Sequence, residues 1–183
     1  MNNKILPKTA LLSVSDKSGL VPFAKFLKKK KIKIIATGGT AKTLRGAGIS
    51  VVSVSRVTGF PEIFGGRVKS MHPKIAGGIL GQRDSDKEEA KKNKIDWIDL
   101  VVCNLYPFEA VTKNKDSTLE EKVEHIDVGG PTMIRSAAKN NKWVSVVVDP
   151  KDYKNIQKSI DGGGIDEKNR LKLAGKAFDH CAS

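Results

Sequence analysis

Two basic side chains in the stretch GGRVKSMHP, residues 65–73, are framed by residues that shape the backbone. Arg67 and Lys69 lie one residue apart, after a Gly-Gly pair and before a His-Pro pair. Most other lysines stand in runs such as KKKK at 28–31, which are typical of a solvated surface. In an extended chain the two side chains would point to opposite sides, but the flanking glycines and proline favour a bend. The stretch is therefore a candidate clamp for an anion.

Two further polar stretches follow predicted strands. SVSDKSG, residues 13–19, comes at the end of the apolar run 9–14, and TGGT, residues 37–40, follows 32–36. Ligands of parallel sheets bind beyond the carboxyl ends of the strands, and a helix that starts there offers free N–H groups to a phosphate. Alone, each stretch could be a helix cap or a tight turn, and neither is a GxxxxGK or GxGxxG motif. Together, the two hydroxyl-rich corners favour a monophosphate over a nucleoside triphosphate.

The stretch CNLYPF, residues 103–108, ends another predicted strand. Asn104 can bind a purine-like or carboxamide edge, and Tyr106 can donate or relay a proton. The alternative is that Tyr106 is a core aromatic before a proline.

The stretch IDVGGPTMIRSAAKN, residues 126–140, places a proline in the first turn of a predicted helix. Arg135 and Lys139 are four residues apart on one face of that helix, where like charges repel mildly. Asp127 and a bound substrate are both candidate partners for one of these cations.

The elements that must position these groups alternate along the chain. Strands are predicted at 9–14, 32–36, 49–54, within 97–105 and at 143–148. Helices are predicted at 18–30, 40–48, 84–94, 118–126, 131–140 and in two C-terminal segments parted by a DGGG turn at 161–164, while 55–82 has no clear assignment. This order predicts an α/β fold with a parallel sheet covered on both faces. The DGGG turn could begin a C-terminal appendage.

The composition describes one globular domain of 183 residues with 29% charged and 39% hydrophobic residues. No apolar run approaches the roughly 20 residues of a membrane span, and the start lacks the features of a signal peptide. The two cysteines have neither metal-ligand spacing nor a disulfide framework. We therefore expect a cytoplasmic protein with free thiols and no membrane partner.

The formal net charge of +13 raises the question of nucleic-acid binding. Lysine supplies 27 of the 33 basic residues, whereas readers of bases and phosphates rely on arginine. Aromatic residues are only 5% and do not interleave with the basic runs. We expect a lysine-rich solvated surface rather than a nucleic-acid partner, with a field that can steer small anions inward.

Five stretches, SVSDKSGL, ATGGTAKTLR, TGFPEIFGGRVKSMHPKIAGGIL, CNLYPF and IDVGGPTMIRSAAKN, closely resemble the IMP cyclohydrolase domain of the bifunctional purine-biosynthesis protein. The resemblance begins near residue 9 and reaches the C-terminus. It implies a methylglyoxal-synthase-like three-layer α/β/α sandwich with a mostly parallel sheet, and a homodimer. The implied reaction closes the ring of 5-formamidoimidazole-4-carboxamide ribotide to give IMP and water, without a metal or other cofactor.

The resemblance also implies a set of site residues. At the reacting groups it places Lys139, as proton donor and acceptor, with Lys69, Tyr106 and Asp127. The nucleotide would be held by Ser15, Asp16, Lys17, Thr37, Gly38, Gly39, Thr40, Arg67, Val68, Ser70, Cys103, Asn104 and Val128. These residue types suit the chemistry, because a carboxamide is a poor nucleophile that needs positioning, donors for a developing oxyanion, and proton relays.

The chain departs from the family pattern at three points. Ser70 stands where many relatives have threonine, and Ala76 where many have histidine, so no role is assigned to position 76. We expect a single domain over residues 1–183, whose segment from about 150 leads toward a formyltransferase domain that the chain does not include. No formyl transfer is expected of it.

Two other functions share parts of this pattern. Methylglyoxal synthase would use a similar phosphate corner but needs neither Asn104 and Tyr106 nor the 65–73 stretch. A regulatory nucleotide-binding module, like that of carbamoyl-phosphate synthetase, needs the phosphate corners but not Lys69, Tyr106, Asp127 and Lys139 together.

Overall fold

The computed structural model describes residues 3–106 and 118–182, within which five parallel strands form one sheet. The strands, in the order β3-β2-β1-β4-β5, are β1 (Thr9–Val14), β2 (Lys33–Ala36), β3 (Val52–Ser53), β4 (Leu100–Asn104) and β5 (Ser145–Val147). The central strand β1 pairs Leu11 with Ile35 of β2 and with Val101 of β4. All three side chains are fully buried, which explains why these strands read as continuous apolar runs.

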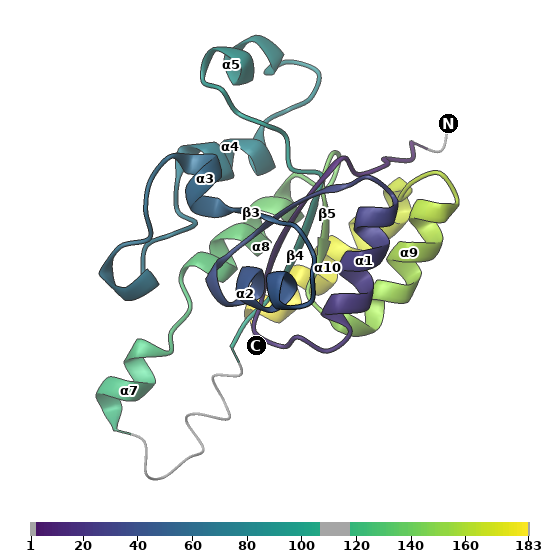
Figure 1. Ribbon diagram of the computed structural model, residues 1–183. Coiled ribbons are helices and arrows are strands. Elements are labelled where there is room, and N and C mark those ends of the chain that lie inside the picture. Colours follow the sequence, from purple (N-terminus) through teal and green to yellow (C-terminus); the bar gives the residue numbers. More distant parts are fainter. Residues whose placement is uncertain (1–2, 107–117, 183) are drawn as a thin grey trace.

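Helices cover both faces of the sheet, so the fold is the predicted three-layer α/β/α sandwich (Figure 1). One layer contains α1 (Leu20–Lys29), α2 (Gly38–Gly46) and α9 (Tyr153–Asp161). The other contains α3 (Val54–Thr58), α4 (Pro73–Leu80), α8 (Gly129–Lys139) and α10 (Glu167–Ala182). The shorter elements are η1 (Phe64–Gly66), α5 (Lys87–Lys92), α7 (Leu119–Glu124) and η2 (Pro150–Asp152).

The region from 49 to 82 differs most from the prediction. The strand predicted at 49–54 is only two residues long, because the Ser53 hydroxyl accepts a hydrogen bond from the Arg56 N–H and starts α3. The unassigned segment 55–82 contains α3, η1 and α4. Helix α4 was not predicted because its glycines lower the helix propensity of the segment. Gly78 is nevertheless required, because a Cβ at this position would lie 2.6 Å from the Asp96 carbonyl oxygen.

The C-terminal helices belong to the sandwich and form no appendage, which corrects the interpretation of the DGGG turn. Ala174 and Ala177 of α10 are buried in the core beneath α8. Arg170 of α10 is 1% exposed and donates hydrogen bonds to backbone carbonyls of Asn3, Asn141, Lys142 and Ile165. The end of the chain is thereby fastened to its beginning and to the loop after α8.

Candidate functional site

A cavity of about 440 Å³ opens at the carboxyl ends of β1 and β4, where the order of the sheet reverses direction. Ligands of open parallel sheets bind at such switch points. Of the predicted site residues, those that line the cavity are Ser15, Thr37, Gly39, Thr40, Arg67, Lys69, Ser70, Asn104, Tyr106, Asp127 and Val128. The corners, the 65–73 stretch and the start of α8 therefore do converge on one place.

The corner after β1 is held in shape by Asn104. Its side-chain oxygen accepts hydrogen bonds from the N–H groups of Ser15, at 2.7 Å, and of Asp16, at 2.9 Å, and its amide nitrogen donates to the Asp16 carbonyl. Asp16 in turn accepts from the Ser18 N–H, and hydrogen bonds from Ser18 lower the pKa of Asp16. Asn104 thus fixes the corner after β1. The sequence predicted only that Asn104 would bind the edge of a ligand, and this structural role was missed.

The corner after β2 presents the start of α2. Thr37 precedes this helix without capping it, because its hydroxyl donates instead to the Ser13 oxygen at 2.8 Å. The Thr40 hydroxyl accepts from the Val14 N–H and donates to the Val14 carbonyl. These hydroxyls bind the two strand ends together, so the backbone N–H groups at the start of α2 are the better donors for an anion.

The 65–73 stretch bends so that Arg67 and Lys69 both line the cavity. Gly65 and Gly66 adopt left-handed φ angles of 65° and 91°, and an isolated bridge joins Val68 to Ile63. The stretch is therefore bent, as the flanking glycines and proline predicted, and not extended. The bend places two cations in the same cavity as the corners after β1 and β2.

Asp127 lines the cavity and contacts the start of α8. Its Oδ1 accepts a hydrogen bond from the Gly130 N–H at 2.7 Å. A Cβ on Gly130 would lie 2.5 Å from the Asp127 Oδ2 and 2.6 Å from a Leu105 methyl group. Any larger residue at position 130 would clash with this carboxylate, so glycine is required for Asp127 to lie against the start of α8.

The cavity also contains groups that the sequence reading missed, contributed by the end of α7. Glu124 pairs with Arg67, with 3.5 Å between Oε1 and Nε. The His125 ring lies 5.0 Å from the Tyr106 ring, and its Nδ1 is 2.6 Å from the Glu121 carbonyl oxygen. In the sequence, 118–126 has the pattern of an ordinary solvated helix with a capping box, which gave no signal of a site.

Six predicted site residues do not line the cavity: Asp16, Lys17, Gly38, Val68, Cys103 and Lys139. Cys103 is buried behind the start of α8, and burial raises the pKa of its thiol. Lys139 is the last residue of α8, and helical rise puts it about 13 Å from Gly130. Arg135, on the same face, lies over the Phe178 ring of α10. Arg135 therefore contacts the Phe178 ring and faces neither Asp127 nor the cavity.

Part of the CNLYPF stretch, Pro107 and Phe108, lies outside the described residues. Among residues 3–106 and 118–182, no group of three or more His, Cys, Asp or Glu side chains is arranged to hold a metal ion. No helix in this part of the chain combines the length and apolar character needed to cross a membrane.

Comparison with known proteins gives two family matches. A model described as MGS-like domain matches residues 19–132, and one described as AICARFT/IMPCHase bienzyme matches residues 137–183. The chain is 49% identical to the bifunctional purine biosynthesis protein PurH of Bacillus cereus and 51% identical to that of Neisseria gonorrhoeae. These alignments cover 97% and 96% of this chain but only 35% and 34% of the relatives, so the chain spans about a third of their length.

A solved structure gives the same result for the fold. The crystal structure of ForH matches with a TM-score of 0.84 and 36% identity, covering 96% of this chain and 94% of that one. The resemblance inferred from the five stretches is confirmed by these relatives. With one family model matched over residues 19–132 and the sandwich fold in place, the chain belongs to the MGS-like domain family.

Proposed function

We propose that the chain is an IMP cyclohydrolase, which closes the ring of 5-formamidoimidazole-4-carboxamide ribotide to IMP with loss of water. The observation that carries this proposal is the convergence of Arg67, Lys69, Tyr106 and Asp127 on one cavity with the two hydroxyl-rich corners. The identity of about 50% to PurH over nearly the whole chain supports it.

In this proposal the corners after β1 and β2 bind the phosphate, and the 65–73 clamp contacts the rest of the substrate. The phosphate of the ribotide lies at the start of α2, where free N–H groups and the helix dipole favour an anion. Ser15 and Lys17 belong to the neighbouring corner, which follows β1. Because Asn104 and Thr40 fix these corners through hydrogen bonds, little order has to be gained when the ligand binds. Val128 and Asn104 line the base and ribose side.

The chemistry requires positioning and two proton transfers. The carboxamide nitrogen attacks the formyl carbon, a C–N bond forms, and the formyl oxygen becomes an oxyanion. The carboxamide nitrogen loses one of its two protons and the formamide nitrogen loses its proton, while the former formyl oxygen gains two protons. The C–O bond then breaks as a C=N bond forms to the formamide nitrogen, which releases water. Lys69 is the cation near this oxyanion, and Arg67 binds the substrate. Tyr106 and Asp127 relay protons, together with Lys139 as the resemblance implies.

Appearance of IMP from the formylated ribotide, followed spectrophotometrically, tests the proposal. We expect IMP to form without formyltetrahydrofolate, at a rate that chelators leave unchanged, and we expect no formyl transfer to the unformylated ribotide. Release of methylglyoxal from a triose phosphate, with no IMP formed, would replace the proposal by its nearest alternative. Nucleotide binding without either reaction would indicate a regulatory module.

Binding measurements test the phosphate corners separately from the chemistry. IMP should bind, and inosine, which lacks the phosphate, should lose most of the affinity. Equal affinities would show that the start of α2 and Lys17 do not hold a phosphate. We also propose that the protein is a cytoplasmic homodimer. Sedimentation equilibrium would measure the mass of the dimer.

A further inference from the structure

The charge of this protein creates a problem of selectivity, on the premise that the proposed function is correct. The chain carries a formal net charge of +13, and Arg67 and Lys69 line the cavity. Such a field attracts the most highly charged nucleotides most strongly. A site for a monophosphate must therefore contain something that disfavours di- and triphosphates, because attraction alone cannot discriminate in that direction.

Glu124 is a carboxylate with no evident role in the fold. It ends α7, lines the cavity, and contacts Arg67 through a pair in which the side chains are 67% and 58% exposed. An exposed pair of this kind contributes little to stability. A negative charge beside the clamp does, however, compete with an anionic ligand for Arg67.

Glu62 is a second carboxylate, and it lies at the phosphate end. A Cβ on Gly38, the first residue of α2, would lie 3.6 and 3.8 Å from its two carboxylate oxygens. A Cβ on Gly66 would lie 3.7 Å from its Oε2 and 3.8 Å from the Lys69 Nζ. Glu62 does not line the cavity, so it stands next to the start of α2 but outside the cavity wall.

We propose that Glu62 and Glu124 restrict the cavity to nucleotides that carry one phosphate group. The start of α2 accepts one phosphate, while Arg67 and Lys69, which line the same cavity, attract anions in general. A second or third phosphate extends from that corner toward Glu62 and adds negative charge to a space already bounded by Glu124. At a separation of about 4 Å in water, repulsion between two unit charges is worth roughly fivefold in affinity.

The test is calorimetric titration of the full chain with IMP, IDP and ITP in magnesium-free, low-salt buffer. The variants are Glu62→Gln, Glu124→Gln and their combination, which remove charge and keep size. Glu120→Gln is the matched control, since this exposed residue is on α7 and does not line the cavity. We expect the wild type to favour IMP over ITP, and the double variant to reduce that preference by roughly fivefold or more.

The control should keep the wild-type preference, and raising salt to about 0.5 M should weaken it. A double variant whose preference for IMP over ITP changes by less than about threefold would overturn the proposal, as would a wild type without any preference. If that occurs while the wild type still forms IMP, the inference fails and the proposed function stands. If the glutamates control the preference but no IMP is formed, the proposed function fails and the inference holds for nucleotide binding. Failure of IMP to bind at all would overturn both.

Discussion

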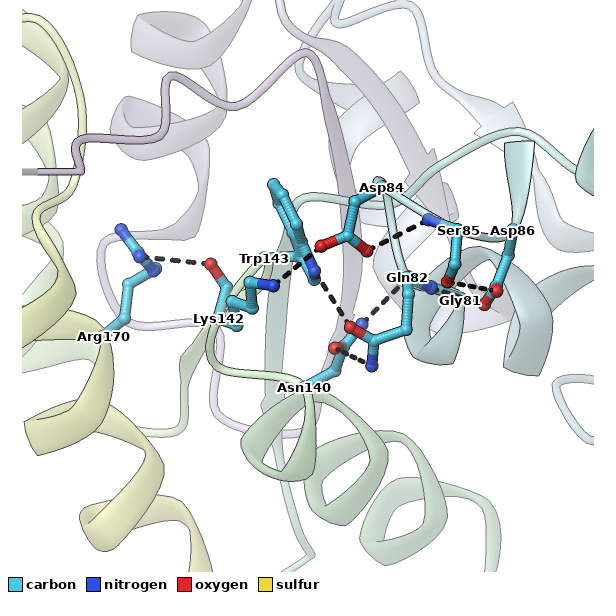
Figure 2. A network of polar contacts seen from close by, with 9 residues as sticks. All are labelled: Gly81, Gln82, Asp84, Ser85, Asp86, Asn140, Lys142, Trp143 and Arg170. Atoms are coloured by element: carbon cyan, nitrogen blue, oxygen red, sulfur yellow. Dashed lines mark hydrogen bonds and ion pairs between the residues drawn. The ribbon is translucent and has the colours of Figure 1, made fainter.

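The two ends of α8 satisfy their polar groups in different ways. At the C-terminal end, side chains are joined in a continuous network (Figure 2). Asn140 donates to the carbonyls of Ile79 and Gly81, and Trp143 donates to the Gln82 side chain at 3.1 Å. The N-terminal end instead combines a glycine pair with one carboxylate, beside cations that are largely exposed.

The network reaches well beyond the helix itself. Lys142 pairs with Asp84 at 2.8 Å, and its carbonyl accepts a hydrogen bond from Arg170 of α10. The C-terminal end of α8 is thereby connected to α4, to the loop that follows α4, and to α10. Lys139 belongs by position to this end of the helix, next to Asn140, and not to the cavity.

The difference indicates that one helix serves two purposes. Polar groups that are fully paired within the protein stabilise it but have little left to offer a ligand. Charged groups that the fold leaves exposed contribute little stability and remain available for binding. We therefore expect substitutions at the network end to lower stability, and those at the cavity end to lower activity while leaving stability nearly unchanged.

The largest effect is expected for Arg170→Met. This change removes the side-chain donor from three partly buried backbone carbonyl oxygens, while the buried Ile165 carbonyl keeps its bond from the Ile5 N–H. We therefore expect the free energy of unfolding to fall by about 3–5 kcal/mol and the melting temperature by about 10 °C. Thermal and urea unfolding measure this. Arg45→Met is the control, because Arg45 is exposed on α2. A normal melting temperature for Arg170→Met would contradict the assignment of stability to this region.

The next effect concerns the proposed proton-transfer groups. Lys69→Ala should reduce kcat/KM by about 100-fold, the usual scale for such a group, and leave the melting temperature unchanged. The resemblance predicts a similar loss for Lys139→Ala. Steady-state kinetics beside thermal melts test both variants. A fully active Lys139→Ala would remove that residue from the catalytic set and strengthen the division between the two ends of α8.

Arg67→Ala should have a smaller effect, on binding. Loss of one exposed cation from the clamp is expected to raise KM by about tenfold and to leave kcat nearly unchanged. Lys29→Ala, in the solvated lysine run, serves as the control for the lowered net charge and should behave as the wild type. An equal change in both variants would mean that the overall field, rather than the clamp, draws in the substrate.

The arrangement of the sheet could be predicted because its causes are local in the sequence. Strand 9–14 was found to the residue, since four of its six positions are apolar and the two polar ones, Thr9 and Ser13, lie at the first and the penultimate position. Convergence of the Ser15, Thr37 and Asn104 corners followed from the rule that parallel strands end at one edge. The assignments of the individual site residues to substrate atoms remain predictions.

The positions of Glu62, Glu124 and His125 could not be predicted. Glu124 and His125 stand in a stretch whose composition is that of solvated surface, and Glu62 stands among apolar residues and glycines in a segment without a clear periodic pattern. Where these side chains lie depends on the paths of the chain around α7 and around η1. One path is bent by left-handed backbone at Phe64, Gly65 and Gly66, and such conformations are selected by contacts distant in the sequence. For Lys139 the sequence gives a distance, because helical rise places it about 12 Å beyond Pro131, but it does not show how far the cavity extends along α8.

The smallest effect expected is a pH dependence at the border between the two regions. His180 of α10 accepts a hydrogen bond from the Leu105 N–H at 3.3 Å, one residue before Tyr106. Burial lowers the pKa of His180, Lys176 lowers it further, and Asp149 opposes both. The unfolded chain therefore takes up a proton at higher pH than the folded one. The stabilising contribution is complete above the ordinary histidine value of about 6.5 and is lost as the pH falls through the folded value.

Thermal melts between about pH 7.5 and pH 5.5 measure this contribution. The wild type should lose stability on acidification by a margin that His180→Gln does not show, because glutamine cannot be protonated there. Solvent reaches part of the ring, so the difference should stay below about 3 °C. His72→Asn, which keeps a side-chain acceptor at the start of α4, is the control and should follow the wild type. If His180→Gln loses as much stability as the wild type, the acid sensitivity originates elsewhere, and the Leu105 hydrogen bond does not connect α10 to the cavity.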